Sequence, residues 1–400
     1  MATVDGWQEG RIFPWGGNTL GERFGFVTMI YFILWCVLYI FNWESLNSVS
    51  LIKFIGVLVI FWGLTFSQLD GTKNTAKIAK AGFIFGIAIP AVILFVLSIA
   101  YIVQGNPIDV KIGAKYFVPD FSKVNTLVIF VSFILAYMGV EASASHVNEL
   151  QDAKKNYPLA MIMLVVLAII LNTIGGLTVA AVIPQGDLSL SSGVVETFKV
   201  LILHFSSNST WLVKLIAILL ALGVMGEVSA WVVGPSRGMY AAAQNGILPK
   251  SLAKTNQHDV PVNLVFVQGV IVTIWAAVLT FGGGGNNVSF LTAISLTVVI
   301  YLVGYLLFFI GYFILVLKKG NLKRAYHVPG GKTFKLIVAA CGFLTSIFAL
   351  VISFVPPAQL TGKSAHEYLT ILIISFIITV LIPFVIYAIT SKKRDVKAIR

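Results

Sequence analysis

Two glutamates stand inside otherwise apolar stretches of the sequence, and they are the side chains best placed to do chemistry. Glu141 lies in "YMGVEASASH", directly after the hydrocarbon run "NTLVIFVSFILA", and Glu227 lies in "GVMGEVSAWVVG". An ionisable side chain in hydrocarbon costs several kcal/mol, so intramembrane carboxylates by default indicate function. Each has a structural alternative: Glu141 as a cap on a break in its own helix, and Glu227 as a buried acid bonded to a neighbouring helix.

Aromatic side chains recur at helical spacing near the second carboxylate and in a later apolar run. Trp231 follows Glu227 by four residues, and Tyr301 and Tyr305 in "VVIYLVGYLLFF" have the same spacing, so each pair shares one helix face. Together with the glutamates they would line a polar cavity for a small zwitterion. By spacing alone, these aromatic residues would be interface or packing residues about as often as cavity residues. His146 favours an interfacial position, although its titration near neutrality keeps a proton relay open.

Small residues surround Glu141, because Gly139 precedes it and the run 142–145 is Ala, Ser, Ala and Ser. Such residues let a helix unwind where it lines a water-filled cavity, and the freed amides and half-helix ends then bind charged substrate groups. The pattern predicts the broken helix of a secondary transporter, with Glu141 as a group that takes up a proton during the cycle.

The composition places the whole chain in one class, an all-α integral membrane protein. Of 400 residues, 58% are hydrophobic and only 11% are charged, which no single water-soluble core accommodates. A spanning helix needs about 20 mostly apolar residues. Ten such runs predict transmembrane helices at 24–41, 50–69, 81–103, 124–147, 157–183, 211–234, 261–281, 288–317, 335–355 and 367–390.

Basic residues predict the orientation of these spans. With both termini in the cytoplasm, most of the 28 Lys and Arg residues fall in cytoplasmic segments, as the positive-inside rule requires. The net charge of +12 then reflects topology and attraction to anionic lipids, so nucleic-acid binding is not needed to explain it. An enzyme is disfavoured, since there is no nucleophile–base pair and no cluster of metal ligands, and no cofactor is indicated.

Segments between the spans are too short to form a soluble domain. The segment 193–205, "GVVETFKVLILHF", has the pattern of an amphipathic helix at the outer surface. The inner stretch 235–260 is expected to form short helices punctuated by Gly246 and Pro249. The segment "FGGGGNNVS" is expected to form a tight outer turn between two spans.

Three stretches carry a resemblance to a known family: "MGVEASASHVNELQDAKKNYPLAM", "GPSRGMYAAAQNGILPKSLAKTNQHDVPVN" and "AYHVPGGKTFK". The chain resembles the amino acid, polyamine and organocation (APC) transporter superfamily, and within it the bacterial glutamate/γ-aminobutyrate antiporters of acid resistance. The resemblance implies two inverted five-helix repeats of the leucine-transporter type plus two further helices, with a substrate site at the midplane.

The resemblance also assigns positions to this site. "GVEASA" would be the discontinuous sixth helix of the family, and the other residues would come from the eighth and tenth helices. The substrate-binding residues so implied are Gly139, Glu141, Glu227, Trp231, Tyr301 and Tyr305. The residues that could be linked to proton transfer are Glu141, Glu227 and His146.

Relative to the family pattern, the chain is expected to be incomplete. It begins at "MATVDGWQEG", which resembles the cytoplasmic end of the family's second helix. The first predicted span would correspond to the family's third helix and is shortened between Phe26 and Tyr31. After the last span, "SKKRDVKAIR" stands where the family has a soluble C-terminal extension. The expected organisation is a single transmembrane transporter domain, 1–400. Its parts are a cytoplasmic segment 1–23, a remnant of the first repeat 24–103, the second repeat 124–317, two extra helices 335–390 and a cytoplasmic tail 391–400.

The function implied by the resemblance is exchange of external glutamate for internal γ-aminobutyrate across the bacterial plasma membrane. This exchange removes an intracellular proton in each decarboxylation cycle and so contributes to acid resistance. Two alternatives remain at the level of sequence: a related amino acid exchanger of other specificity, and a truncated remnant or membrane subunit that does not transport. The partners indicated are the two amino acids and the lipid bilayer, and the oligomeric state is not indicated.

Overall fold

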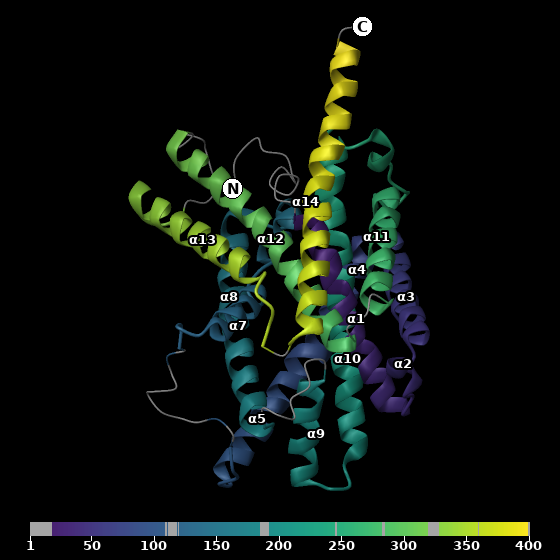
Figure 1. Ribbon diagram of the computed structural model, residues 1–400, viewed down its shortest axis with the longest axis vertical. Helices are drawn as coiled ribbons and strands as arrows, with labels where there is room; N and C mark the ends of the chain where they lie inside the picture. Colours follow the sequence, from purple (N-terminus) through teal and green to yellow (C-terminus); the bar gives the residue numbers. More distant parts are fainter. Residues whose placement is uncertain are drawn as a thin grey trace.

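The structure is a computed structural model that describes residues 18–108, 110, 118, 120–184, 192–244, 246–281, 285–318, 328–358 and 360–398. Within these ranges the secondary structure is entirely helical, which confirms the predicted all-α class. Most of the helices run along the long axis of the molecule and form one bundle, whereas α12 and α13 are tilted away from that axis (Figure 1).

The first part of the bundle contains four long helical segments and several short ones. Its elements are α1 (Asn18–Phe41), α2 (Ser45–Ser48), α3 (Ser50–Ser67), the 3₁₀ turn η1 (Gln68–Asp70), α4 (Thr72–Phe83), the π-helical turn η2 (Ile84–Ala88) and α5 (Ile89–Val103). The second part comprises α7 (Val124–Leu135), the 3₁₀ helix η3 (Val140–Glu149), α8 (Ala153–Val182), α9 (Gly193–Phe205), α10 (Thr210–Gln244), η4 (Lys250–Ala253), α11 (Val262–Phe281), α12 (Gly285–Lys318), α13 (Lys332–Ile352) and α14 (Lys363–Ala398).

Eight helices among the described residues are long and apolar enough to cross a membrane, by length and composition. Each of the ten predicted spans coincides with a helical segment, and α1 covers the whole of the first predicted span. α7 has only 12 residues, so the prediction of a full-length fourth span was wrong. The fourth span, predicted over 124–147, ends as an α-helix at Leu135 because the chain breaks there.

Several helices are longer than predicted, because they continue past their apolar parts. α10 runs unbroken to Gln244, through a region predicted as separate short helices, and α14 continues to Ala398 through the predicted tail. In Figure 1, α14 extends beyond the other helices and carries the C-terminus. α12 begins at Gly285, inside the predicted turn. Hydropathy marks where a chain leaves hydrocarbon, but a helix forms its hydrogen bonds within its own backbone and does not need hydrocarbon around it to continue.

The predicted amphipathic helix is present as α9, with the predicted bounds. Its buried face includes Val195, Phe198 and Leu201, which pack in one cluster with Val213 and Ile216 of α10. Burial of large apolar side chains of this kind contributes about 1.5–3 kcal/mol each. α9 is therefore fixed to the end of α10 rather than only resting at a surface.

Glycines bring α4, η2 and α10 into close contact. A Cβ atom on Gly82 would lie 3.0 Å from Gly226 Cα, and one on Gly86 would overlap the backbone of Gly223. Small residues at such crossings let two backbones approach in membranes. This contact places the middle of α10, with Glu227, against the segment that contains the π-helical turn.

A second core surrounds the middle of α10 from the other sides. Ile30 of α1, Phe61 of α3, Val228 of α10 and Val272 of α11 are fully buried in one cluster, with Trp231 packed at its edge. α10 is thus held by neighbours along much of its length, which gives the site a rigid wall.

Candidate functional site

The predicted helix break is present between α7 and η3. The last turns of α7 close with hydrogen bonds from Tyr137 N to Ile134 O (3.1 Å) and from Met138 N to Leu135 O (3.1 Å). Gly139 then adopts φ 93°, a left-handed conformation that side chains disfavour, and η3 starts at the next residue. The glycine is therefore what allows the chain to change direction inside the apolar run.

Tyr305 of α12 holds the break together. The Gly139 N–H donates to Tyr305 Oη at 3.0 Å, and the Tyr305 hydroxyl donates to Glu141 Oε2 at 2.5 Å. The backbone N–H groups of Gly139 and Glu141 also face this carboxylate. One phenol thus satisfies an amide that the break freed and a carboxylate that would be costly in hydrocarbon without donors.

Trp231 and Tyr301 enclose the glycine from two other helices. A Cβ atom on Gly139 would lie 2.5 Å from Trp231 Cη2, 2.9 Å from Trp231 Cζ2 and 3.6 Å from Tyr301 Oη. The rings of Tyr301 and Tyr305 are 6.2 Å apart between centroids. The structure therefore brings Gly139, Glu141, Trp231, Tyr301 and Tyr305 together, from η3, α10 and α12.

Glu227 joins this group through Trp231, whose indole N–H donates a hydrogen bond to the Glu227 carboxylate one turn earlier on α10. The Glu227 side chain is exposed, although protein atoms surround it on most sides. Trp231 contacts Gly139 on one side and Glu227 on the other, so the indole links the surroundings of the two glutamates.

His146 lies in η3, but its side chain is outside the described residues, so its role stays a prediction. Across the part of the chain that the structure describes, no three His, Cys, Asp or Glu side chains cluster closely enough to hold a metal ion. Cys36 is buried and Cys341 is exposed, and both are free thiols on separate helices.

Sequence reasoning missed a third tyrosine beside the break. Tyr157 of α8 has its hydroxyl 3.2 Å from Ser143 Oγ, and it interacts electrostatically with Glu141. It stands in one of the stretches that carry the family resemblance, "NELQDAKKNYPLAM", directly before a proline. A phenol at the start of a span was the available signal, but spacing alone did not connect it to η3.

A buried lysine was also missed. Lys53, near the start of α3, is only 6% exposed, and its Nζ lies 4.0 Å from the centroid of the Tyr31 ring. The Tyr31 hydroxyl is hydrogen-bonded to Thr280 Oγ1 at 2.9 Å. The sequence placed Lys53 at an outer helix end, and its burial between α1 and α3 follows from packing that spacing does not reveal.

The described side of the site is rich in hydrogen-bond acceptors. Two carboxylates and two phenol oxygens, with an aromatic face from Trp231, suit the ammonium group of a small molecule, because cations bind both carboxylates and aromatic faces. The phenol hydroxyls are also donors, so the same residues can bind a hydrogen-bond acceptor such as a substrate carboxylate. The arrangement therefore fits a binding site rather than a centre for bond making.

Residues 15–382 match the family of amino acid permeases. This chain belongs to the amino acid permease family. The match extends over both the break and the aromatic residues that enclose it, and it confirms the resemblance on which the sequence interpretation depended. The permease is a multi-pass membrane protein.

Two relatives of the permease are bacterial antiporters. The permease is 64% identical over 407 residues to a glutamate/γ-aminobutyrate antiporter of Lactococcus lactis subsp. lactis (strain IL1403), and 65% identical over 407 residues to one of Lactococcus lactis subsp. cremoris (strain MG1363). Each match covers 98% of this chain and 81% of the relative. A transporter of Legionella pneumophila is 28% identical over 399 residues, or 96% of this chain and 84% of that protein.

Proposed function

We propose that the permease is an antiporter that exchanges extracellular glutamate for intracellular γ-aminobutyrate across the bacterial plasma membrane. The observation that carries this proposal is the identity of 64–65% over 98% of the chain to two proteins of that name. The same observation favours this substrate pair over an exchanger of other specificity.

The site supports the exchange in its chemistry. Glutamate and γ-aminobutyrate share an ammonium group and a side-chain carboxylate, and differ by one carboxylate. In the proposal, Glu141 and Glu227 bind the ammonium group in turn, while Trp231 and the phenols of Tyr301 and Tyr305 enclose the carbon chain. A carboxylate that releases a cation can take up a proton instead, which is the proposed link of Glu141 and Glu227 to protons. His146, close to Glu141 in the sequence, is proposed to share this link.

The proposed direction follows from metabolism and charge. Decarboxylation of imported glutamate consumes one cytoplasmic proton and releases CO2, and exchange of the glutamate anion for zwitterionic γ-aminobutyrate moves one net negative charge inward, so the cycle resists acidification. We infer that both termini lie in the cytoplasm, because that arrangement places most basic residues on the inner side. Within the single transporter domain, 124–317 would form one repeat and 335–390 two additional spans.

The test is counterflow in liposomes. Purified protein is reconstituted into vesicles loaded with unlabelled γ-aminobutyrate, and uptake of labelled glutamate is measured at acidic and neutral pH. Uptake that depends on internal γ-aminobutyrate and rises at acidic pH is the expected result, with unloaded vesicles and vesicles without protein as controls.

Two other results would contradict the proposal in different ways. Uptake of another amino acid without uptake of glutamate would make the permease an exchanger of other specificity. Failure of every amino acid to exchange, in protein that is monodisperse and thermally stable, would identify a chain that does not transport in this form.

A further inference from the structure

A chain of three polar groups connects α8 to the helix break. Tyr157 Oη lies 3.2 Å from Ser143 Oγ, and Ser143 Oγ lies 2.7 Å from the carbonyl oxygen of Val140. Ser143 Oγ also lies 3.6 Å from the sulfur of Met161, one turn further along α8. These groups are partly buried, so water competes with the contacts only in part.

The donors in this chain follow from what each atom can do. A serine hydroxyl has one hydrogen, and the Val140 carbonyl is purely an acceptor at the shorter distance, so Ser143 donates to Val140. The Ser143 oxygen then accepts, and the Tyr157 hydroxyl is the donor. The sequence of bonds is therefore Tyr157 to Ser143 to the Val140 carbonyl.

The end of this chain is the peptide group that carries Glu141. Val140 follows the left-handed Gly139, and its carbonyl belongs to the peptide bond that joins it to Glu141. A fixed carbonyl orients the whole planar peptide. From α12, Tyr305 bonds the Gly139 N–H and the Glu141 carboxylate. From α8, Tyr157 acts through Ser143 on the peptide group that lies between them.

Pro158 gives this contact a particular mechanical setting. A proline within a helix removes one backbone hydrogen bond, here to the carbonyl of Lys154, and weakens the first turns. The turn that carries Tyr157 is therefore less firmly joined to the rest of α8. The hydrogen bond to Ser143 links that turn to η3.

We propose that Tyr157 is a positioning residue of the exchange site, which acts through Ser143 to fix the peptide between Val140 and Glu141 and so the direction of the Glu141 carboxylate. This inference rests on the exchange function proposed above and deepens it. It predicts that loss of the Tyr157 hydroxyl impairs substrate binding rather than folding.

The experiment compares Tyr157→Phe, Ser143→Ala and the double variant in the vesicle assay. Each single variant should raise the KM for glutamate about three- to tenfold with a smaller change in maximal rate, because one partly buried hydrogen bond is lost. The double variant should resemble a single one, since both act through the same chain of bonds. Tyr39→Phe is the matched control, because Tyr39 stacks on Trp35 of α1 and is not part of the site.

A second measurement does not depend on transport. Hydrogen–deuterium exchange of the purified protein should show faster uptake in peptides that cover 139–145 for Tyr157→Phe and Ser143→Ala, and no change for Tyr39→Phe. Active wild-type protein with unchanged KM and unchanged deuterium uptake in Tyr157→Phe would overturn the inference alone. If the wild-type protein is inactive, the proposed function fails, and the proposed role of Tyr157 in exchange fails together with it.

Discussion

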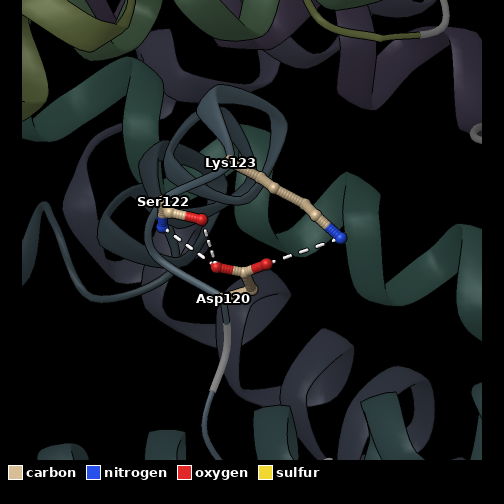
Figure 2. A network of polar contacts seen from close by, with 3 residues as sticks. All are labelled: Asp120, Ser122 and Lys123. Atoms are coloured by element: carbon tan, nitrogen blue, oxygen red, sulfur yellow. Dashed lines mark hydrogen bonds and ion pairs between the residues drawn. The ribbon is translucent and has the colours of Figure 1, made fainter.

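Carboxylate networks lie before and after α7, and their surroundings differ completely. Before the helix, Asp120 Oδ1 accepts hydrogen bonds from the backbone N–H of Ser122 at 3.2 Å and from its hydroxyl at 2.6 Å. Asp120 Oδ2 lies 3.4 Å from Lys123 Nζ (Figure 2). After the helix, Glu141 accepts a hydrogen bond from Tyr305. Both carboxylates have donors, but only the second is largely enclosed by other helices.

Exposure decides what each network does. The side chains of Asp120 and Lys123 are 52% and 72% exposed, so water can replace every partner, and such ion pairs contribute little to stability. The partners of Asp120 come from its own turn, whereas those of Glu141 come from α12 and from the break itself. The first network shapes a local turn, and the second joins parts of the chain that are far apart in sequence.

The largest effect is expected from Glu141→Gln, which keeps the shape of the side chain and removes its charge. Loss of a charged acceptor from an enclosed site should lower glutamate exchange by roughly ten- to hundredfold and weaken its dependence on pH. The measurement is the rate of counterflow across a pH series. Wild-type rates and an unchanged pH profile would reduce Glu141 to a structural role.

The second-largest loss of exchange is expected from Gly139→Ala, because it adds both a steric clash and backbone strain. The added Cβ meets Trp231 at 2.5 Å, and alanine must adopt φ 93°, which alone costs about 1–2 kcal/mol. Gly246→Ala is the matched control, since Gly246 has φ 70° but no atom within 4 Å of the new Cβ. Gly139→Ala should lower the exchange rate several-fold more than Gly246→Ala does. It should also lower the midpoint of thermal unfolding by more. Equal losses would show that the contact with Trp231 is unimportant.

Tyr305→Phe is expected to have a smaller effect than either, because it removes one hydroxyl and leaves the ring. The Gly139 amide and the Glu141 carboxylate lose a shared partner, which should raise the KM for glutamate about three- to tenfold. Protein abundance should change less than affinity. A variant with normal KM and low abundance would show that Tyr305 stabilises the fold without shaping the site.

The position of the break was predictable from the sequence, because its causes are local. A glycine, a carboxylate and small residues within an apolar run are unusual enough to indicate an unwound helix, and Gly139 and Glu141 occupy it. The shared face of Glu227 and Trp231 was predictable for the same reason, since it depends only on helical spacing.

The partners of the break were less predictable, because they depend on how helices pack. Nothing in the spacing of Tyr301 and Tyr305 says which of them bonds Glu141, and Tyr157 has no periodic partner at all. The end of α10 was misplaced for a related reason: polar residues after the apolar run indicate exit from the bilayer, while the helix continues. Sequence thus predicts where a polar group enters the membrane, and packing decides what satisfies it.

The smallest effect is expected from Asp120→Asn, the counterpart of Glu141→Gln at the other end of α7. Hydrogen bonds from Ser122 and the charge of Lys123 hold the pKa of Asp120 below its ordinary value of 3.8. Any stability from this lowered pKa is present above the ordinary value and is lost as pH falls through the lowered one. Asp120 therefore stays ionised between about pH 5 and 7, where its contribution is constant. Exchange by Asp120→Asn should stay within about twofold of wild type at each pH, because water replaces exposed partners. A shifted pH profile would mean that the turn at Asp120, and not the enclosed glutamate alone, senses protons.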